Sequence, residues 1–487
     1  MTNTAAPKPA PRRAAPTSSA RAALTALCLG LFMIVVDTSI VSVAVPAMVR
    51  DLHAGLNAVV WVTSVYLLTY AVPMLFTSRL ADRYGPKRLF VAGLALFTAA
   101  CLGAATAPDI QVLIAVRAVE GLGAALLTPQ TLTLITHLYP DGERGRAMGV
   151  LGATSGLATV TGPLLGGVLV DRLGWEWIFY LNVLLGTGTL VLSLRVLPDW
   201  RPGHARRIDP LGVLLSGAGL TLIVFGVQNG RSYDWGKLVG PVTVPQVIAA
   251  GVVLLGAFAL SQRSTRDDPL LPLSLFQDRN FSVSTLITAA LGFSTTGMFL
   301  PLVLHLQSTL GLTPTQAGLL TAPMALVAAT MGPFIGRLSD RVNAKYLVLS
   351  GLLGMALGLS LVAVRTFRDA PAWQCVPGLL VCGLGMGLVL VPLNNAALGT
   401  VRPELRGTAS GTYFTARQLG AVLGSATTSA VLQARSAQAA YLPLVLVLLL
   451  GVAAATVLRG RRSAAVWPAR TVRRRGRGGG SPAAPGR

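Results

Sequence analysis

Charged residues are scarce in this chain. Only 12% of its 487 residues are Asp, Glu, Lys or Arg, whereas 53% are hydrophobic and the mean hydropathy is +0.64. A soluble globular chain of this length carries about a quarter charged residues to cover its surface. The deficit excludes an ordinary soluble protein and indicates that most of the surface meets lipid.

Acidic residues are the rarer of the charged types. The chain has 18 Asp and Glu against 40 Lys and Arg, which gives a formal net charge of +22. The basic residues do not form one face or one domain but lie in short loops and tails, so we predict no nucleic-acid partner. The cluster Arg473, Arg474, Arg475 and Arg477 instead predicts a cytoplasmic tail attracted to anionic membrane lipids.

Cysteine and histidine are also few, with four of each. Cys28, Cys101, Cys375 and Cys382 lie inside apolar stretches and lack metal-ligand spacing. The sequence carries no Gly-x-x-x-x-Gly-Lys phosphate loop, and no His, Ser or carboxylate cluster gathers at a membrane interface. We therefore predict no metal, no cofactor and no enzyme activity.

Long apolar runs are abundant. Stretches of about 20 apolar residues suit a membrane-spanning helix, and they form two sets of about six. They lie at 22–45, 59–78, 89–107, 110–137, 147–171 and 175–197, then at 281–304, 316–336, 346–364, 373–398, 408–432 and 440–458, with two more at 209–228 and 245–262 between the sets. We predict an all-α polytopic membrane protein of about 14 transmembrane helices.

Lys and Arg gather in alternate loops. With the N-terminus inside, the inner loops and tails hold roughly thirty of them and the outer loops about seven, which satisfies the positive-inside rule. The inner group includes Arg206, Arg263 and Lys345. This asymmetry predicts a protein of the inner, cytoplasmic membrane with both termini in the cytoplasm, and it favours an even number of spans.

The two sets of runs are related by an internal repeat. Arg79–Arg83 recurs as Arg337–Arg341, and Glu143–Gly145 recurs as Leu405–Gly407 at nearly the same offset. An even number of spans separates the copies, which predicts two six-helix bundles in parallel repeat with two extra central helices. The predicted parts are a disordered tail at 1–21, a bundle at 22–197, the extra helices at 209–262, a second bundle at 281–458 and a basic disordered tail at 459–487.

Four motifs stand in order along the chain. Asp37–Pro46 lies in the first run, Ser78–Arg88 in the loop after the second, and Arg117–Ala125 in the fourth. The fifth run carries Gly152, Gly156, Gly162, Pro163, Gly166 and Gly167. Together they resemble the major facilitator superfamily, specifically its fourteen-helix drug:proton antiporter branch. The resemblance covers nearly the whole chain and implies, in order, an embedded aspartate, a cytoplasmic gating loop, a proton-coupling motif and an antiport motif.

The sequence departs from the family pattern in places. The gating loop usually opens with glycine and here has Ser78, and its second copy has Asn343 where Gly85 corresponds. Position 120 is more often glutamine in this branch, so Glu120 adds a carboxylate. These departures put the packing of the loop, and the carry-over of a proton-coupling role to Glu120, in question.

The predicted proton-coupling residues are Asp37, Arg117 and Glu120. Asp37 lies roughly 20 Å from the inner face, where a charge costs on the order of 3 kcal/mol, so it should face the bundle interior with a partner or a proton. Arg117 lies at a similar depth, which predicts contact between the two. Glu120 either neutralises Arg117 at the i,i+3 spacing or provides a second proton or cation site, and both readings stay open.

Two further sets of residues are candidates. The resemblance implies that the gating loop and its copy latch the two halves in the outward-facing state, although a solvated charge run is the alternative. The gating set is Asp82, Arg83, Gly85, Arg88, Asp340 and Arg341. Candidate substrate-cavity residues are Arg417 and Gln418 in one span and Asn394 and Asn395 in another.

These features predict a proton-coupled antiporter that exports lipophilic or cationic drug-like compounds or antibiotics, with no obligate protein partner. A dedicated exporter of one endogenous metabolite, or an importer of the same fold without antiport, remains the alternative. The second set of runs has no carboxylate at mid-span, which predicts poor handling of divalent cations.

Overall fold

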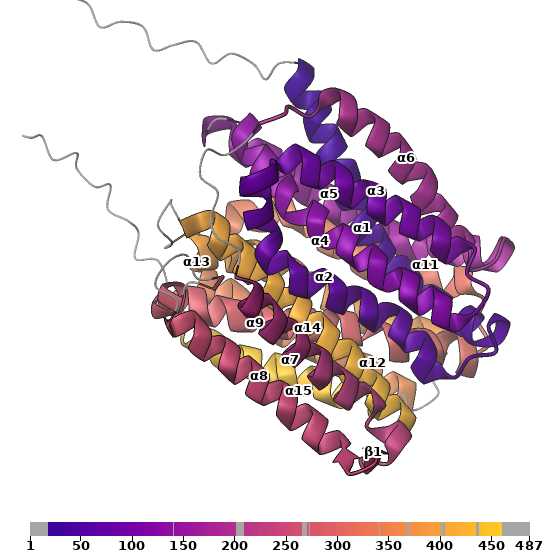
Figure 1. Ribbon diagram of the computed structural model, residues 1–487. Coiled ribbons are helices and arrows are strands. Elements are labelled where there is room, and N and C mark those ends of the chain that lie inside the picture. The colour runs from indigo at the N-terminus through magenta and orange to yellow at the C-terminus, as the bar shows by residue number, and fades with distance from the viewer. Residues whose placement is uncertain are drawn as a thin grey trace, which may run out of the picture.

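The computed structural model shows a bundle of long helices with one small strand pair (Figure 1). It describes residues 18–139, 141–200, 209–264, 270–271, 273–339, 341–367, 371–399, 401, 405–434 and 438–459. The predicted tails at 1–21 and 459–487 fall largely outside these residues. So does Asp340 of the predicted gating set.

The first part of the chain forms six long helices. These are α1 (Ser18–Asp51), α2 (Leu56–Tyr84), α3 (Pro86–Ala105), α4 (Ile110–Leu138), α5 (Asp141–Arg172) and α6 (Trp177–Val196). Local chemistry sets several ends: Pro86 occupies the first turn of α3, and the Asp109 carboxylate accepts from the N–H groups of Gln111 and Val112, both at 2.9 Å, to cap α4. Gly93 of α3 and Gly123 of α4 face each other, so these helices pack backbone to backbone.

Two long helices follow, α7 (Pro210–Asn229) and α8 (Val244–Ser264). The segment between them contains the short helix η1 (Arg231–Tyr233) and the strands β1 (Lys237–Val239) and β2 (Val242–Thr243), and the short helix η2 (Leu273–Gln277) follows α8. The strands are antiparallel. Helix α7 packs on α8 and also on α2 and α14.

The last part of the chain forms another group of helices. These are α9 (Arg279–Gly297), α10 (Phe299–Leu304), the π-helical turn η3 (His305–Thr309), α11 (Pro314–Ser339), α12 (Ala344–Phe367), η4 (Ala372–Cys375), α13 (Val376–Leu398), α14 (Arg406–Ala434) and α15 (Tyr441–Thr456). The run predicted as one span at 281–304 is therefore built from α9 and α10, and it continues into η3.

Each group of helices has its own apolar core. Phe90 and Phe97 belong to a buried cluster drawn mainly from α1–α4, whereas Leu302, Met355 and Tyr441 belong to one drawn from α9–α15. We refer to α1–α6 as the N-half and to α9–α15 as the C-half. The exact domain boundaries given above stay predictions.

The membrane-spanning character of the chain is confirmed at a coarse level. Eleven helices within the described residues are long and apolar enough to cross a membrane, judged by length and composition. Helices α11, α14 and α15 are not among them; α15 has only 16 residues. The chain is thus a predominantly helical, multi-pass membrane protein, while the count of fourteen spans stays a prediction.

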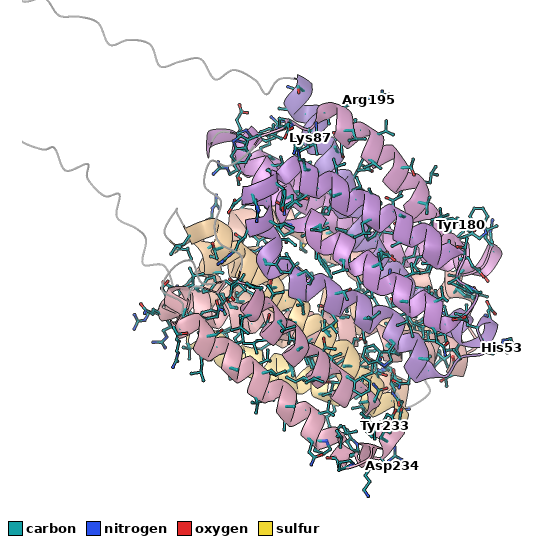
Figure 2. All side chains as sticks on the ribbon, in the orientation of Figure 1. His53, Lys87, Tyr180, Arg195, Tyr233 and Asp234 are labelled. Carbon is teal, nitrogen blue, oxygen red and sulfur yellow. The ribbon has the colours of Figure 1, made fainter. Side chains whose placement is uncertain are left out.

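The bundle has two distinct ends. We call the end where α1 begins and α15 ends the tail end, and the end that carries β1 and β2 the hairpin end (Figure 1). Lys87 and Arg195 lie toward the tail end, whereas His53 and Asp234 lie toward the hairpin end (Figure 2). At the tail end, the Tyr139 hydroxyl donates to the carbonyl of Ala20 at 2.9 Å and fixes the start of α1 against the end of α4.

The two halves touch at the hairpin end through α5 and α11. Gly167 packs on the backbone of Pro314, and Gly318 packs on the carbonyl of Pro163. The Thr315 hydroxyl donates to Asp171 Oδ2 at 2.8 Å across the same contact. These positions lie nearest the hairpin end of both helices, and only glycine permits such a close approach.

The same two helices have free space on their tail-end halves. A side chain added at Gly149 or Gly152 of α5, or at Gly332 or Gly336 of α11, would meet nothing within 4 Å. Helices α2 and α14 follow this pattern. The Ser64 and Ser425 hydroxyl oxygens lie 3.3 Å apart on the hairpin side, whereas a side chain at Gly411, nearer the tail end, would meet nothing within 4 Å. The contact between the halves is therefore concentrated toward the hairpin end.

Replacing Gly318 by leucine should force α11 away from α5, because its Cβ would collide with the Pro163 carbonyl. The readout is disulfide formation between cysteines placed at Asp171 and Thr315, whose native side chains are hydrogen-bonded. We expect ready crosslinking in the parent chain and at least a halved yield with Gly318→Leu. The four native cysteines are buried and should not interfere.

The matched control is Gly332→Leu, on the same helix, where the added side chain meets nothing within 4 Å. This variant should keep the parental crosslinking yield. Equal yields in the two leucine variants would contradict the described contact between the halves.

Candidate functional site

Three charged side chains meet inside the N-half. Asp37 of α1 and Arg117 and Glu120 of α4 are all 0% exposed. Arg117 Nη1 lies 2.9 Å from Asp37 Oδ2 and 2.8 Å from Glu120 Oε2, so both carboxylates contact one guanidinium nitrogen. Asp37 lies 14 residues before the end of α1, or about 21 Å along the helix axis, so the cluster is deep in the bundle.

Four residues from three further helices, α2, α3 and α6, hold this cluster in place. Arg117 Nε donates to the backbone carbonyl of Val62 at 3.2 Å, and Asn182 Nδ2 donates to Asp37 Oδ1 at 3.3 Å. The Cys101 thiol donates to Glu120 Oε1 at 3.4 Å. The Tyr66 ring lies beneath the guanidinium, with its centroid 4.1 Å from the central carbon of Arg117, a distance suited to a cation–π contact.

The charges of the cluster do not balance when every group is ionised. Two carboxylates against one guanidinium leave a net charge of −1, and one bound proton makes the cluster neutral. Burial away from water penalises a net charge far more than a neutral, hydrogen-bonded group. A single proton is therefore the difference between a charged and a neutral form of this buried cluster.

The cluster also retains unused hydrogen-bonding capacity. Arg117 Nη2, Tyr66 Oη and Asn182 Oδ1 are buried and have no hydrogen-bond partner among the described residues. Such groups are costly to leave unpaired. They are therefore available for contacts that the described arrangement does not make.

The structure brings together the three residues predicted for proton coupling. The contact between Asp37 and Arg117, expected from their similar depths, is present. Glu120 does pair with Arg117 at the i,i+3 spacing, and this contact leaves open whether it also carries a proton. Sequence reasoning missed Asn182 and Tyr66; the available signal was an amide and a phenol inside otherwise apolar runs.

The glycine motif of α5 performs two kinds of packing. Gly162 packs on Val36 and Ser39 of α1, and Gly166 packs on Ile40, all within one turn of Asp37. Gly167, one residue further on, packs on α11 of the C-half as described above. A single helix thus joins the surroundings of Asp37 to the contact between the halves. Gly156 reaches Ala329 of α11, whereas Gly152 faces open space.

The predicted gating residues lie at the tail end. Asp82 and Arg83 end α2, and Gly85 links α2 to α3 with a φ of +93°, which favours glycine. Arg88 pairs with Asp199 at 3.5 Å, with both side chains more than half exposed. Arg341 is exposed, and its neighbour Asp340 lies outside the described residues. A latch between the two copies of the loop stays a prediction.

The predicted cavity residues occupy different levels of the bundle. Arg417 and Gln418 are partly buried in the middle of α14. Asn394 is partly buried and Asn395 is exposed, and both lie in the last turns of α13 at the tail end. These two pairs therefore do not form one site at a common depth.

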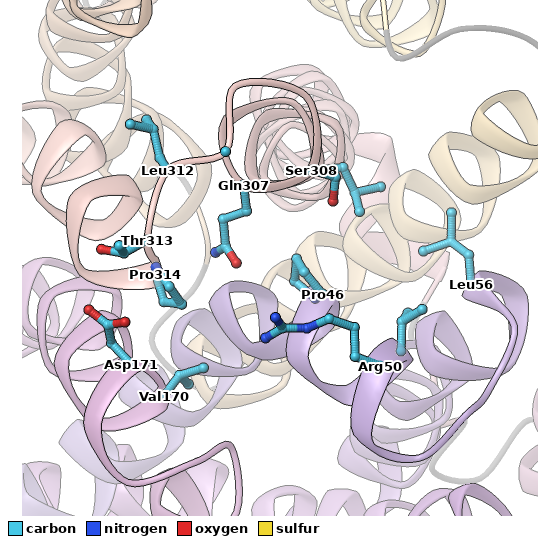
Figure 3. Close-up of a pocket in the computed structure, with 13 residues that line it drawn as sticks. Pro46, Arg50, Leu56, Val170, Asp171, Gln307, Ser308, Leu312, Thr313 and Pro314 are labelled. Carbon is cyan, nitrogen blue, oxygen red and sulfur yellow. The ribbon is translucent and has the colours of Figure 1, made fainter.

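A cavity of about 670 Å³ opens at the hairpin end, between the two halves (Figure 3). Arg50 and Asp171 of the N-half and Gln307 of η3 line it. Gln307 Nε2 also donates to the carbonyl of Val43 at 3.1 Å, across the halves. This cavity lies beyond the contact of α5 with α11 and is separate from the buried cluster.

Removing the cation from the cluster should destabilise the protein more than removing one carboxylate. Arg117→Gln leaves two buried carboxylates without a counter-charge, at a cost of about 3–5 kcal/mol. Asp37→Asn leaves one carboxylate paired with Arg117 and should be well tolerated. Thermal unfolding in detergent, followed by size-exclusion chromatography, should therefore rank Arg117→Gln far below Asp37→Asn. Equal losses would contradict the charge balance described here.

Comparison with known proteins places these features in context. A model of the Major Facilitator Superfamily matches residues 27–425 and residues 283–483. An uncharacterized MFS-type transporter of Mycobacterium tuberculosis is 42% identical over 429 residues, which cover 88% of this chain and 73% of the relative. The multidrug resistance protein Stp of the same species is 34% identical, over 84% of this chain and 75% of its own length.

A cephamycin export protein of Amycolatopsis lactamdurans is 36% identical over 420 residues, covering 85% of each chain. Among solved structures, the xylose transporter of E. coli in a partially occluded inward open conformation is similar in fold. The TM-score is 0.63, with 14% sequence identity, over 90% of this chain and 97% of the other. At this identity the likeness concerns the fold alone.

Proposed function

The chain belongs to the major facilitator superfamily, and from this premise we propose that it exports drug-like compounds or antibiotics across the cytoplasmic membrane in exchange for protons. The names of its relatives, which include a multidrug resistance protein and a cephamycin export protein, support export. The chain is a transporter rather than an enzyme.

One observation carries the antiport part of the proposal: two carboxylates share one guanidinium in a fully buried site. An acid deep in a membrane bundle is a natural proton carrier, because burial disfavours its charged form. We assign the exchanged proton to the pair Asp37 and Glu120, and we assign to Arg117 the task of holding both. The proton belongs to the cluster, since the two acids contact the same nitrogen.

The proton is coupled to movement of the halves through α1 and α5. Loss of the proton restores a net charge of −1 to the cluster and strengthens the electrostatic attraction between Arg117 and Asp37. Because Gly162 and Gly166 leave no space between α5 and α1, any shift of α1 displaces α5. Helix α5 in turn contacts α11 at Gly167 and Gly318, so the displacement reaches the contact between the halves.

We place the tail end in the cytoplasm, in keeping with the positive-inside rule. The halves then touch on the outer side and separate on the inner side, which corresponds to an inward-facing state. Helices α11, α14 and α15 add to the eleven apolar helices and give fourteen spans, with both termini inside.

The cycle follows from these assignments. In the inward-facing state the compound enters from the cytoplasm or inner leaflet, and the cluster releases its proton inward. The halves then separate at the hairpin end, the compound leaves, and a proton from outside neutralises the cluster. Export is thus driven by the proton gradient.

A dedicated exporter of one endogenous metabolite is the second candidate. The relative named for cephamycin export favours it, because that name specifies a single class of compound. The two candidates share the antiport mechanism and differ in breadth. A susceptibility panel of chemically diverse compounds, with and without an uncoupler, separates them: protection against several unrelated compounds supports broad export.

Asp37→Asn should abolish exchange, because it removes the acid that is linked to α5. In inverted membrane vesicles with an imposed pH gradient, addition of an exported antibiotic should release protons through the parent protein. We expect a rate at least tenfold lower with Asp37→Asn, and a smaller loss with Glu120→Gln.

The matched control is Asp234→Asn, the same chemical change at a carboxylate that is 84% exposed in the hairpin-end loop. It should keep the parental rate. Undiminished proton release with Asp37→Asn would remove the assigned carrier, and release that is insensitive to both substitutions would place the carrier outside the cluster. A parent protein that releases no protons when the antibiotic is added would refute the antiport proposal.

A further inference from the structure

Arg417 is an intramembrane cation that the proton cluster does not use. It is the twelfth residue of the 29-residue helix α14, about 16 Å along the axis from the tail end of that helix. A charge at this depth is costly unless it meets a partner, and it marks a functional site by default. Arg417 is therefore expected to have a counter-ion or an anionic ligand.

No counter-ion for Arg417 is present in the described structure. Between their printed bounds, the helices α9 to α15 contain no Asp or Glu. The buried carboxylates of the N-half, Asp37 and Glu120, are already engaged by Arg117. Among the described residues, none forms a hydrogen bond or ion pair with the Arg417 guanidinium.

The guanidinium faces the interface between the halves. It lies within electrostatic range of Tyr70, which is at the middle of α2 in the N-half, and of Tyr413 on its own helix. The contact of Ser425 with Ser64 closes the interface two turns nearer the hairpin end. On the other side, Gly411 faces open space. Arg417 thus lies where the halves begin to separate, and it is only partly buried.

One unpaired hydroxyl group lies close to Arg417 in the sequence. The Thr415 hydroxyl, two residues before Arg417 on α14, is buried and has no hydrogen-bond partner among the described residues. Gly292 of α9 packs directly on the Arg417 carbonyl, and Thr288, one turn away on α9, interacts with the Tyr413 side chain. Buried hydroxyls are normally paired, so the Thr415 hydroxyl is available for a new contact.

We propose that Arg417 binds the carboxylate or other acidic group of the exported compound. A guanidinium offers a planar fork of donors that fits a carboxylate with two parallel hydrogen bonds. An anion removes the cost of the unpaired charge, whereas a cation at the same place is repelled. The exporter then prefers acidic compounds over neutral or cationic compounds of the same shape.

This inference rests on the proposed function and narrows its substrate class. It runs against the cationic substrates expected from the sequence and agrees with the expected poor handling of divalent cations. The absence of carboxylates from the described C-half helices leaves nothing there to attract a cation. Export of an anion is also favoured by a membrane potential that is negative inside.

The test is a binding measurement on the purified protein in lipid nanodiscs, without a proton gradient. Three fluorescent probes share one apolar body: pyrenebutyrate, pyrenebutyramide and pyrenebutylamine. Fluorescence anisotropy should show the acid binding at least tenfold more tightly than the amide or the amine. With Arg417→Gln the affinity for the acid should fall about tenfold, while the affinity for the amide stays within twofold.

Two further variants complete the design. Arg417→Lys keeps a positive charge and should retain part of the preference for the acid. Arg365→Gln removes an exposed arginine at the hairpin end, which is paired with Gln374 at 3.0 Å, and should change nothing. Unchanged affinity for the amide shows that the variants remain folded.

The proposal is overturned if pyrenebutyrate does not bind, if the amide or amine binds as tightly, or if Arg417→Gln keeps the preference for the acid. Because this measurement needs no transport, it separates the two proposals. An Arg417-dependent preference in a protein that releases no protons would refute antiport and leave this site in place.

Discussion

The N-half is organised around one guanidinium that holds two carboxylates away from water. The Arg117 side chain is held in position by contacts with the Val62 carbonyl, the Tyr66 ring and both acids. The cluster also changes its net charge whenever a proton binds. A buried site that is neutral in one protonation state and charged in the other cannot be indifferent to the packing around it. In the proposed mechanism, the helices that surround Asp37 are the ones that respond to the proton.

Glycine residues of α5 connect the surroundings of Asp37 to the contact between the two halves. Helix α5 presents Gly162 and Gly166 to α1 and Gly167 to α11, so that it lies against both without intervening side chains. Close contact of this kind is stiff, because an added methyl group has nowhere to go. The described glycines toward the opposite ends, Gly149 and Gly152 of α5 and Gly332 and Gly336 of α11, make no such contact. The asymmetry gives the two halves one closed side and one open side, with Arg417 at the level where they part.

Much of this arrangement could be predicted from the sequence. The apolar runs and the repeat of Arg79–Arg83 at Arg337–Arg341 predict helical halves, and the depth of Asp37 predicts its contact with Arg117. Other features depend on how helices distant in the sequence come together. The local pattern marks Asn182 and Tyr66 as polar residues inside apolar runs, but it does not show that they meet the cluster. It also does not show that Arg417 has no counter-ion in the described helices. The break of one predicted span into α9, α10 and a π-helical turn was equally invisible, because its hydropathy is continuous.

The central claim is that the cluster of Asp37, Glu120 and Arg117 binds and releases a proton. Infrared difference spectroscopy of the purified protein, recorded across a pH titration, observes the protonated carboxyl group directly. The account predicts a titrating carboxyl band that shifts or diminishes in Asp37→Asn and in Glu120→Gln and is absent from the double variant. A band that persists unchanged in the double variant would place the proton elsewhere and contradict the account.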